Sequence, residues 1–128
     1  MRKTAVLATF VLSVLAGCDS PSAIDSYGLI HTETAAGTLT VSNVGGQPVH
    51  YNVLERVDAG TVFWGKCTPA DQGCPTLAPG QSVRIPYVQI ARYDEGDTEA
   101  IVYWWESRPN SAGGYDIGRE GTVIVQLD

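Results

Sequence analysis

From residue 38 onward, hydrophobic and polar positions alternate along the chain with a period of two. Leu39 and Val41 are separated by threonines and serine, and Val49, Tyr51 and Val53 share one side of the next run. Such alternation places successive side chains on opposite faces, which is typical of a strand with one buried face. The pattern predicts strands at residues 38–42, 49–53, 61–66, 83–85, 100–106 and 122–127.

Turn-forming residues separate these segments. Residues 43–48 (Asn-Val-Gly-Gly-Gln-Pro) and 58–60 predict turns, because Asn and Gly reach positive φ at little cost and proline presets its own φ. Residues 67–80 carry three prolines and predict an irregular excursion. Residues 94–98 predict an acidic loop, and residues 107–118 predict a loop rich in Gly, Ser, Asn and Pro.

No segment after the N-terminal apolar run shows a helical period, so the fold class predicted is all-β. Six or seven short strands joined by turns indicate an antiparallel β-sandwich of about seven strands. Pro86 cannot donate a ladder hydrogen bond, so we expect the strand before it at a sheet edge or at a bend.

Two turn motifs carry a resemblance to a known family. Residues 41–45 (Val-Ser-Asn-Val-Gly) followed by Pro48-Val49, and residues 77–82 (Leu-Ala-Pro-Gly-Gln-Ser), resemble the turns of small bacterial immunoglobulin-like modules. The resemblance covers roughly residues 38–127 and implies an immunoglobulin-like sandwich. Its motifs are turn chemistry, so they bear on the fold alone.

The first eighteen residues have the pattern of an export signal. A cationic start, Met1-Arg2-Lys3, precedes an apolar run at residues 5–14 that is too short to span a bilayer. The following Leu15-Ala16-Gly17-Cys18 resembles the lipobox of bacterial lipoproteins, which implies that Cys18 is lipidated, with palmitate among its acyl chains, and becomes the first mature residue. The alternative is an ordinary secretory signal in which Cys18 is incidental. Asp19 resembles the signal that keeps enteric lipoproteins at the inner membrane.

This interpretation divides the chain into three parts: a signal peptide at 1–17, a lipidated cysteine and tether at 18–27, and a β-sandwich domain at 28–128. Removal of the signal leaves 111 of the 128 residues, with six of the eight basic residues and all 14 acidic ones, a formal charge of −8. Such a surface repels phosphate backbones, so we expect no nucleic acid partner. The lipid is the expected membrane attachment.

The remaining cysteines, Cys67 and Cys74, form an even pair in a chain expected to be exported. We expect a disulfide across residues 68–73, since oxidising compartments favour one. They are too close in sequence to form the inter-sheet bridge of antibody domains. Metal binding is the alternative, but further cysteines are lacking and His31 and His50 lie far away in sequence. A redox pair would need C-x-x-C spacing.

Two motifs suggest ligands and are weak. Residues 60–67 nearly match a phosphate-binding P-loop, but Cys67 stands where a magnesium-binding hydroxyl is needed and the middle of the motif is expected to be a strand. Asp94, Glu95, Asp97 and Glu99 could hold calcium, but the spacing is not that of an EF-hand. A solvated acidic loop is the simpler interpretation, and we expect no cofactor.

Aromatic residues are the strongest binding candidates. On a strand, Tyr103 and Trp105 point to one face and Trp104 to the other. We take Tyr103 and Trp105 to face the core. Trp104, together with Trp64, is then a possible aromatic face for a sugar ring or a partner protein, although packing is the commoner role of such residues.

The sequence offers no recognisable catalytic constellation. Neither His31 nor His50 stands near a serine elbow or a general-acid pair, and Glu106 and Asp116 could approach each other in any acidic domain. We therefore expect a non-catalytic module, lipid-anchored in the bacterial cell envelope and facing the periplasm or exterior, that binds another envelope protein or stabilises an assembly. The alternative is a module that binds a glycan or calcium.

Overall fold

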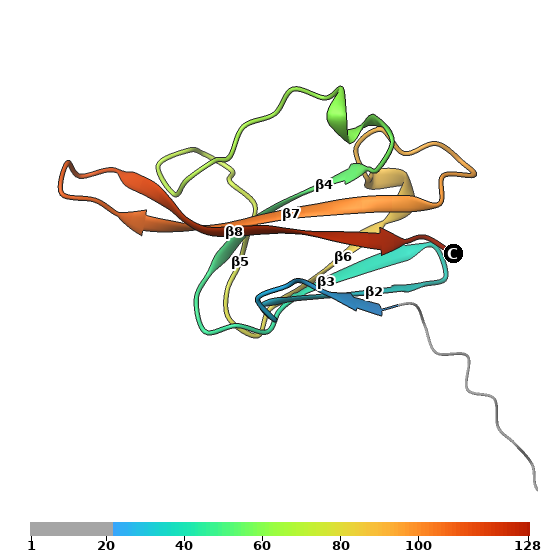
Figure 1. Ribbon diagram of the computed structural model, residues 1–128, viewed down its shortest axis with the longest axis horizontal. Helices are drawn as coiled ribbons and strands as arrows, with labels where there is room; N and C mark the ends of the chain where they lie inside the picture. Colours follow the sequence, from blue (N-terminus) through green and yellow to red (C-terminus); the bar gives the residue numbers. More distant parts are fainter. Residues whose placement is uncertain (1–21) are drawn as a thin grey trace, which may run out of the picture.

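The computed structural model describes residues 22–128 as two four-stranded antiparallel sheets (Figure 1). The first sheet has the order β1-β2-β3-β6 and the second the order β5-β4-β7-β8. Two 3-10 turns, η1 (Asp58–Gly60) and η2 (Tyr87–Gln89), connect strands. The strands are β1 (Ser22–Ile24), β2 (Ile30–Ala35), β3 (Thr38–Asn43), β4 (Val49–Glu55), β5 (Thr76–Leu77), β6 (Ser82–Pro86), β7 (Glu99–Pro109) and β8 (Tyr115–Gln126).

This arrangement confirms the all-β sandwich expected from the sequence. With β1 as an added edge strand, β2-β3-β6 opposite β5-β4-β7-β8 is the order in which immunoglobulin-like sandwiches pair their strands. The strand that ends at Pro86 is at a sheet edge, as expected. Within residues 22–128, no helix has the length and apolar character needed to cross a membrane.

Alternation builds the core between the two sheets. In β3, Leu39 and Val41 are fully buried while the threonines beside them are half-buried, so one face of the strand meets the opposite sheet. Valines from β4, β7 and β8 meet them, and each such side chain contributes about 1.5–3 kcal/mol when it leaves water. The buried members of this core are Ile30, Leu39, Val41, Val49, Val53, Leu77, Tyr87, Ile90, Ala100, Val102, Trp104, Val123, Val125 and Leu127.

The turn between β3 and β4 forms as expected, and Asn43 holds it. Its side-chain nitrogen donates to the carbonyl oxygens of Gln47 at 2.7 Å and Leu77 at 3.0 Å, and its side-chain oxygen accepts from the amide of Gly45. Asn43 is fully buried, so these bonds satisfy a polar group that would otherwise be costly to bury.

Three sequence-based expectations about elements are wrong. Residues 61–66 form an irregular segment rather than a strand. Most of the expected loop at 107–118 belongs to a long β7–β8 hairpin that turns at residues 110–114 and protrudes beyond the sandwich (Figure 1). The expected tether at 18–27 already contains β1, which pairs with β2 from Ser22 onward.

The segment between β4 and β5 covers the outer face of the second sheet. Trp64 packs on Tyr103 and Trp105, with ring centroids 4.6 and 5.7 Å away. The indole nitrogen of Trp105 donates to the carbonyl oxygen of Cys67 at 2.7 Å. A second apolar cluster of Leu54, Ala59 and Ile101 lies under the same segment. The irregular segment therefore acts as a third layer.

The disulfide expected between Cys67 and Cys74 is present, with Cα atoms 5.6 Å apart. It joins two points of the covering segment, so it constrains the layer that lies over Trp105. Closing so short a loop stabilises by about 2.5 kcal/mol on the chain-entropy account.

The described chain begins and ends near the same end of the sandwich. Ser22 pairs with Glu33, and the hydroxyl of Thr34, one residue further, donates to the carbonyl oxygen of Gln126 at the end of β8. Because β8 runs the full length of its sheet, its first residue, Tyr115, lies at the opposite end. The chain therefore enters the domain at the end remote from the β7–β8 hairpin (Figure 1).

Candidate functional site

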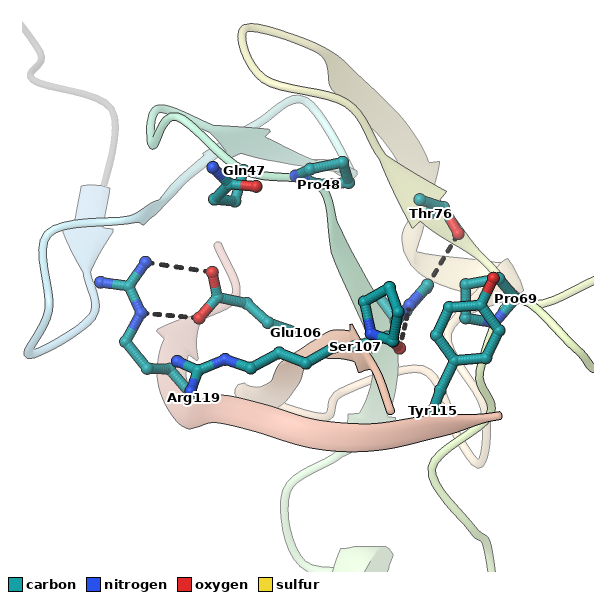
Figure 2. A pocket seen from close by; sticks show the side chains of 11 residues that line it. Gln47, Pro48, Pro69, Thr76, Glu106, Ser107, Tyr115 and Arg119 are labelled. Carbon is teal, nitrogen blue, oxygen red and sulfur yellow. Dashed lines mark hydrogen bonds and ion pairs between the residues drawn. The ribbon is translucent and has the colours of Figure 1, made fainter. Parts of the chain in front are cut away.

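A cleft of about 570 Å³ opens at the hairpin end of the second sheet (Figure 2). Its walls are the turn before β4, the stapled segment and β5 on one side, and the two strands of the hairpin on the other. The lining residues are Gln47, Pro48, His50, Pro69, Thr76, Glu106, Ser107, Arg108, Pro109, Tyr115 and Arg119.

The cleft exists because β7 extends beyond its neighbour β4. The last pair of the β4–β7 ladder is His50 with Trp105. Continuing this register would bring Pro48 beside Ser107, but proline has no N–H to donate to a ladder. The chain leaves the sheet there, and β7 continues to Pro109 with β8 as its partner. The side of β7 that faced β4 is thus open to the cleft.

An ion pair forms part of the cleft wall. Arg119 donates from Nε and Nη2 to the two carboxylate oxygens of Glu106 at 2.6 and 3.0 Å (Figure 2). Glu106 is buried, and the hydrogen bonds from Arg119 outweigh its desolvation, so the pKa of Glu106 lies below its usual value. A β-bulge creates this geometry: between the pairs Trp105–Glu120 and Ser107–Ile117, Glu106 faces two residues of β8.

Gly118, one of those two residues, has a steric role in the wall. A Cβ built there would lie 2.9 Å from Nε of Arg108 and 3.2 Å from Cβ of Glu106. The missing side chain therefore lets Arg108 and Glu106 lie close to the backbone of β8. Arg108 makes no ion pair of 4.0 Å or less within residues 22–128, whereas Arg119 is neutralised by Glu106. The charged side chains that line the cleft thus carry one more positive than negative charge, and the charge of Arg108 also helps to lower the pKa of Glu106.

His50 lies at the base of the cleft and joins β4, β5 and β7. Its Nε2 is 2.7 Å from the hydroxyl oxygen of Ser107, and its Nδ1 is 2.9 Å from the hydroxyl oxygen of Thr76 and 3.3 Å from Sγ of Cys74. His50 is 3% exposed, and burial lowers its pKa, so the neutral imidazole is favoured. His50, Thr76 and Ser107 thus form a network of neutral polar groups in the same cleft as the Glu106–Arg119 ion pair.

A second, smaller cavity of about 310 Å³ lies along β8. It is lined by Lys66, Tyr103, Trp104, Glu120, Gly121 and Thr122. Lys66 and Glu120 form an ion pair of 2.7 Å across it. The indole nitrogen of Trp104 is fully buried without a hydrogen-bond partner within residues 22–128, so it is not open to a ligand.

The aromatic face expected from the sequence is not formed by Trp104. Trp104 is fully buried between the sheets, so the expectation that its side of β7 meets solvent is wrong. Tyr103 and Trp105 point outward, the reverse of the expected register, and the segment carrying Trp64 covers them. Trp64 is itself half-buried by this packing.

The four acidic residues considered for calcium do not converge. Asp97 accepts a hydrogen bond from the backbone amide of Asp94, and Glu99 accepts one from Gln126 on the neighbouring strand. Glu95 is exposed. Within residues 22–128, no group of three or more His, Cys, Asp or Glu side chains is arranged to hold a metal ion.

The remaining candidates from the sequence lie on separate segments of the chain. Cys18 lies outside the described residues. The P-loop-like stretch contains no strand, and its Cys67 is taken by the disulfide. His31 lies on β2, 3.9 Å from Glu33, and does not line the cleft.

The structure brings together residues that sequence reasoning did not combine. His50 and Ser107 are 57 positions apart, and Glu106 and Arg119 are 13 apart. Two sequence signals were available: His50 is polar between the apolar Val49 and Tyr51, and Glu106-Ser107 directly follows an aromatic, strand-like run. Comparisons with protein-family models, curated proteins and solved structures found no match to this chain.

Proposed function

We propose that this protein is a lipid-anchored, extracytoplasmic interaction module that binds a partner protein of the cell envelope at the cleft. The observation that carries the proposal is the position of the cleft, at the end of the sandwich opposite the point where the chain enters. The export-signal pattern and the resemblance of residues 15–18 to a lipobox supply the anchor.

The short distance between anchor and domain supports this orientation. Cys18 and Ser22 are four residue steps apart, and each step spans at most about 3.6 Å, so the lipid and the start of β1 are within about 14 Å of each other. The eleven steps of β8 from Tyr115 to Gln126 measure about 36 Å at 3.3 Å each. An anchor at Cys18 therefore holds the entry end near the bilayer and leaves the cleft accessible to a partner away from the membrane.

The lining of the cleft suits a protein segment. Three prolines and the ring of Tyr115 supply apolar surface, while Ser107 and Arg108 supply polar contacts. Arginine and tyrosine are favoured at protein interfaces because each combines a large contact area with directed hydrogen bonds. The charge of Arg108, on a domain that is otherwise strongly acidic, favours an acidic group on the partner.

A glycan is the second candidate, and one observation favours it. Tyr115 offers a partly exposed ring at one end of the cleft and the bidentate Glu106–Arg119 pair lies at the other end (Figure 2), and a sugar needs an apolar surface for its ring together with donors and acceptors for its hydroxyls.

Photo-crosslinking in intact cells tests the proposal. A photoreactive phenylalanine analogue replaces Tyr115 at the cleft, and a matched variant carries it at Val88, which is highly exposed on η2 at the entry end. We expect a discrete protein adduct from position 115 and none from position 88. A glycosidase-sensitive adduct at 115 would favour the glycan, and adducts at 88 with none at 115 would contradict a cleft directed at the partner.

A further inference from the structure

We infer that Ser107 is a nucleophilic hydroxyl, with His50 as its base, that forms a covalent adduct with activated acyl or phosphonyl groups entering the cleft. This property goes beyond the proposed binding function and does not depend on it.

The hydrogen bonds around His50 assign its tautomer. The hydroxyl of Thr76 donates its hydrogen to the carbonyl oxygen of Cys74 at 3.0 Å. With that hydrogen used, the Thr76 oxygen can only accept from Nδ1 of His50, 2.9 Å away. Nδ1 therefore carries the imidazole hydrogen, and Nε2 carries a lone pair.

The lone pair on Nε2 is directed at Ser107. The 2.7 Å separation of Nε2 from the serine oxygen requires that the hydroxyl hydrogen lie between them, donated by Ser107. A serine whose hydrogen is held by a neutral imidazole, itself oriented by a third group, is the arrangement that activates a hydroxyl for attack. Burial lowers the pKa of His50 and keeps that imidazole neutral in the resting protein.

Ser107 is also accessible to a reagent. It is half-buried and lines the cleft of about 570 Å³, which exceeds the volume of a small acyl or phosphonyl group. Arg108 lines the same cleft without an ion pair among residues 22–128. Its guanidinium adds a positive charge to the cleft, which favours the entry of an anionic or polarised reagent.

The step balances with a fluorophosphonate or an activated ester. The serine oxygen attacks phosphorus or the carbonyl carbon while its proton moves to Nε2 of His50. A P–O or C–O bond to Ser107 forms, and the bond to fluoride or to the alcohol breaks. The proton on Nε2 then leaves with the departing group.

Thr76, the group that orients His50, limits the hydrolysis of the adduct on Ser107. Thr76 is neutral and cannot stabilise the imidazolium as a carboxylate would. We therefore expect an adduct that accumulates with a stoichiometry of one rather than rapid hydrolysis.

A fluorophosphonate probe tests the inference on the protein as cells export it. Peptide mass spectrometry should place one adduct on Ser107. Ser82 is the matched control, since its hydroxyl also makes a hydrogen bond of 2.7 Å, to Ser42, but has no histidine partner among residues 22–128. Ser107→Ala should remove the adduct.

Two further variants separate activation from folding. His50→Gln should slow labelling at least about 100-fold, the usual contribution of a positioned base. Thr76 is exposed, and Thr76→Val removes the hydroxyl that orients His50. This variant should slow labelling while the thermal midpoint stays near that of the wild type. Labelling of Ser107 no faster than that of Ser82, or unchanged rates in both variants, would overturn the inference. Wild-type protein separates the two proposals: a crosslink at position 115 without an adduct on Ser107 would overturn only this inference, and an adduct on Ser107 without a crosslink at position 115 would overturn only the proposed binding function.

Discussion

The indole of Trp104 lies directly against Gly121 on the neighbouring strand. A Cβ built on Gly121 would come within 2.8 Å of Nε1 and 2.9 Å of Cε2 of this ring. The two residues are paired in the β7–β8 ladder, so the glycine supplies the space that a fully buried tryptophan needs at the inner face of the sheet.

Gly121→Ala should therefore destabilise the domain. The atoms it meets belong to a rigid ring that is packed on all sides, so relief requires a shift of the ring or of β8, and such overpacking costs about 1–3 kcal/mol. Gly46→Ala is the matched control, because its Cβ would meet nothing within 4 Å. Urea denaturation measures both. Equal midpoints for the two variants would show that Trp104 has room to move.

Both tryptophans of β7 should be essential for stability. Trp104 is 0% and Trp105 1% exposed, one facing the core and the other the covering segment. Replacing either by alanine should cost about 3–5 kcal/mol, a large part of the 5–15 kcal/mol that holds a typical domain. Phe63→Ala, at a fully exposed position of the same covering segment, should change little. A mild effect of Trp105→Ala in urea melts would mean that the third layer opens readily.

The tryptophans also mark where sequence reasoning succeeds and fails for this fold. Alternation predicts that Trp104 and Trp105 point to opposite faces, because that relation is local to the strand. It cannot predict that both faces are covered, since the cover over Trp105 is an irregular segment without periodicity. The β-branched and aromatic residues at 61–66 belong to this covering segment. Their composition predicts a strand that the structure does not contain.

The missed strand β2 has a different cause. Its inward positions after Ile30 are Thr32 and Thr34, which are fully buried without being hydrophobic. Their hydroxyls donate to the carbonyl oxygens of Ala23 and Gln126, so burial is satisfied by hydrogen bonds rather than by apolar character. A search for alternating hydrophobic residues therefore does not detect such a strand.

The Glu106–Arg119 pair should make stability depend on acid pH. The pKa of Glu106 is lowered in the folded protein, chiefly by the hydrogen bonds from Arg119, relative to its usual value of 4.5. A depressed folded pKa means that the ionised carboxylate stabilises the fold above the unfolded pKa, and that this stabilisation is lost as pH falls through the folded pKa. Glu106→Gln should thus be clearly less stable than the wild type at pH 7, and the difference should shrink below about pH 4.5.

Urea melts at several pH values check this expectation. Glu95→Gln is the control, since Glu95 is exposed and makes no ion pair within residues 22–128. A gap between the wild type and Glu106→Gln that is the same at pH 3 and pH 7 would show that the variant acts through packing and not through the charge.

The disulfide should stabilise the third layer and with it the cleft wall. The variant with Cys67→Ser and Cys74→Ser should lose about 2.5 kcal/mol, the loop-closure entropy of so short a ring. Since Trp105 donates to Cys67, its fluorescence should shift toward that of a solvated indole. Intact mass with alkylation and no reductant should find both thiols masked in wild-type protein. Two free thiols in protein from its native compartment would contradict the bond.

The cleft shows why the candidate site could not be foreseen. Its polar network joins β4, β5 and β7 through His50, Thr76 and Ser107, and the register that aligns them depends on where Pro48 ends the ladder. No short spacing in the sequence predicts that these three residues lie together. The disulfide could be predicted, because it depends on an even cysteine pair in a chain expected to be exported and not on long-range register.

Lipidation at Cys18 is the prediction that decides the orientation of the whole domain. The disulfide occupies Cys67 and Cys74, so Cys18 is the remaining thiol of the three cysteines. Each buried methylene of an acyl chain contributes about 0.8 kcal/mol, so two or three chains hold a protein firmly in a bilayer. Wild-type protein should incorporate labelled palmitate and partition into detergent, and Cys18→Ala should do neither. The double serine variant at positions 67 and 74 is the matched control and should keep its label. Equal labelling of wild type and Cys18→Ala would remove the anchor, and with it the argument that the cleft faces away from the membrane.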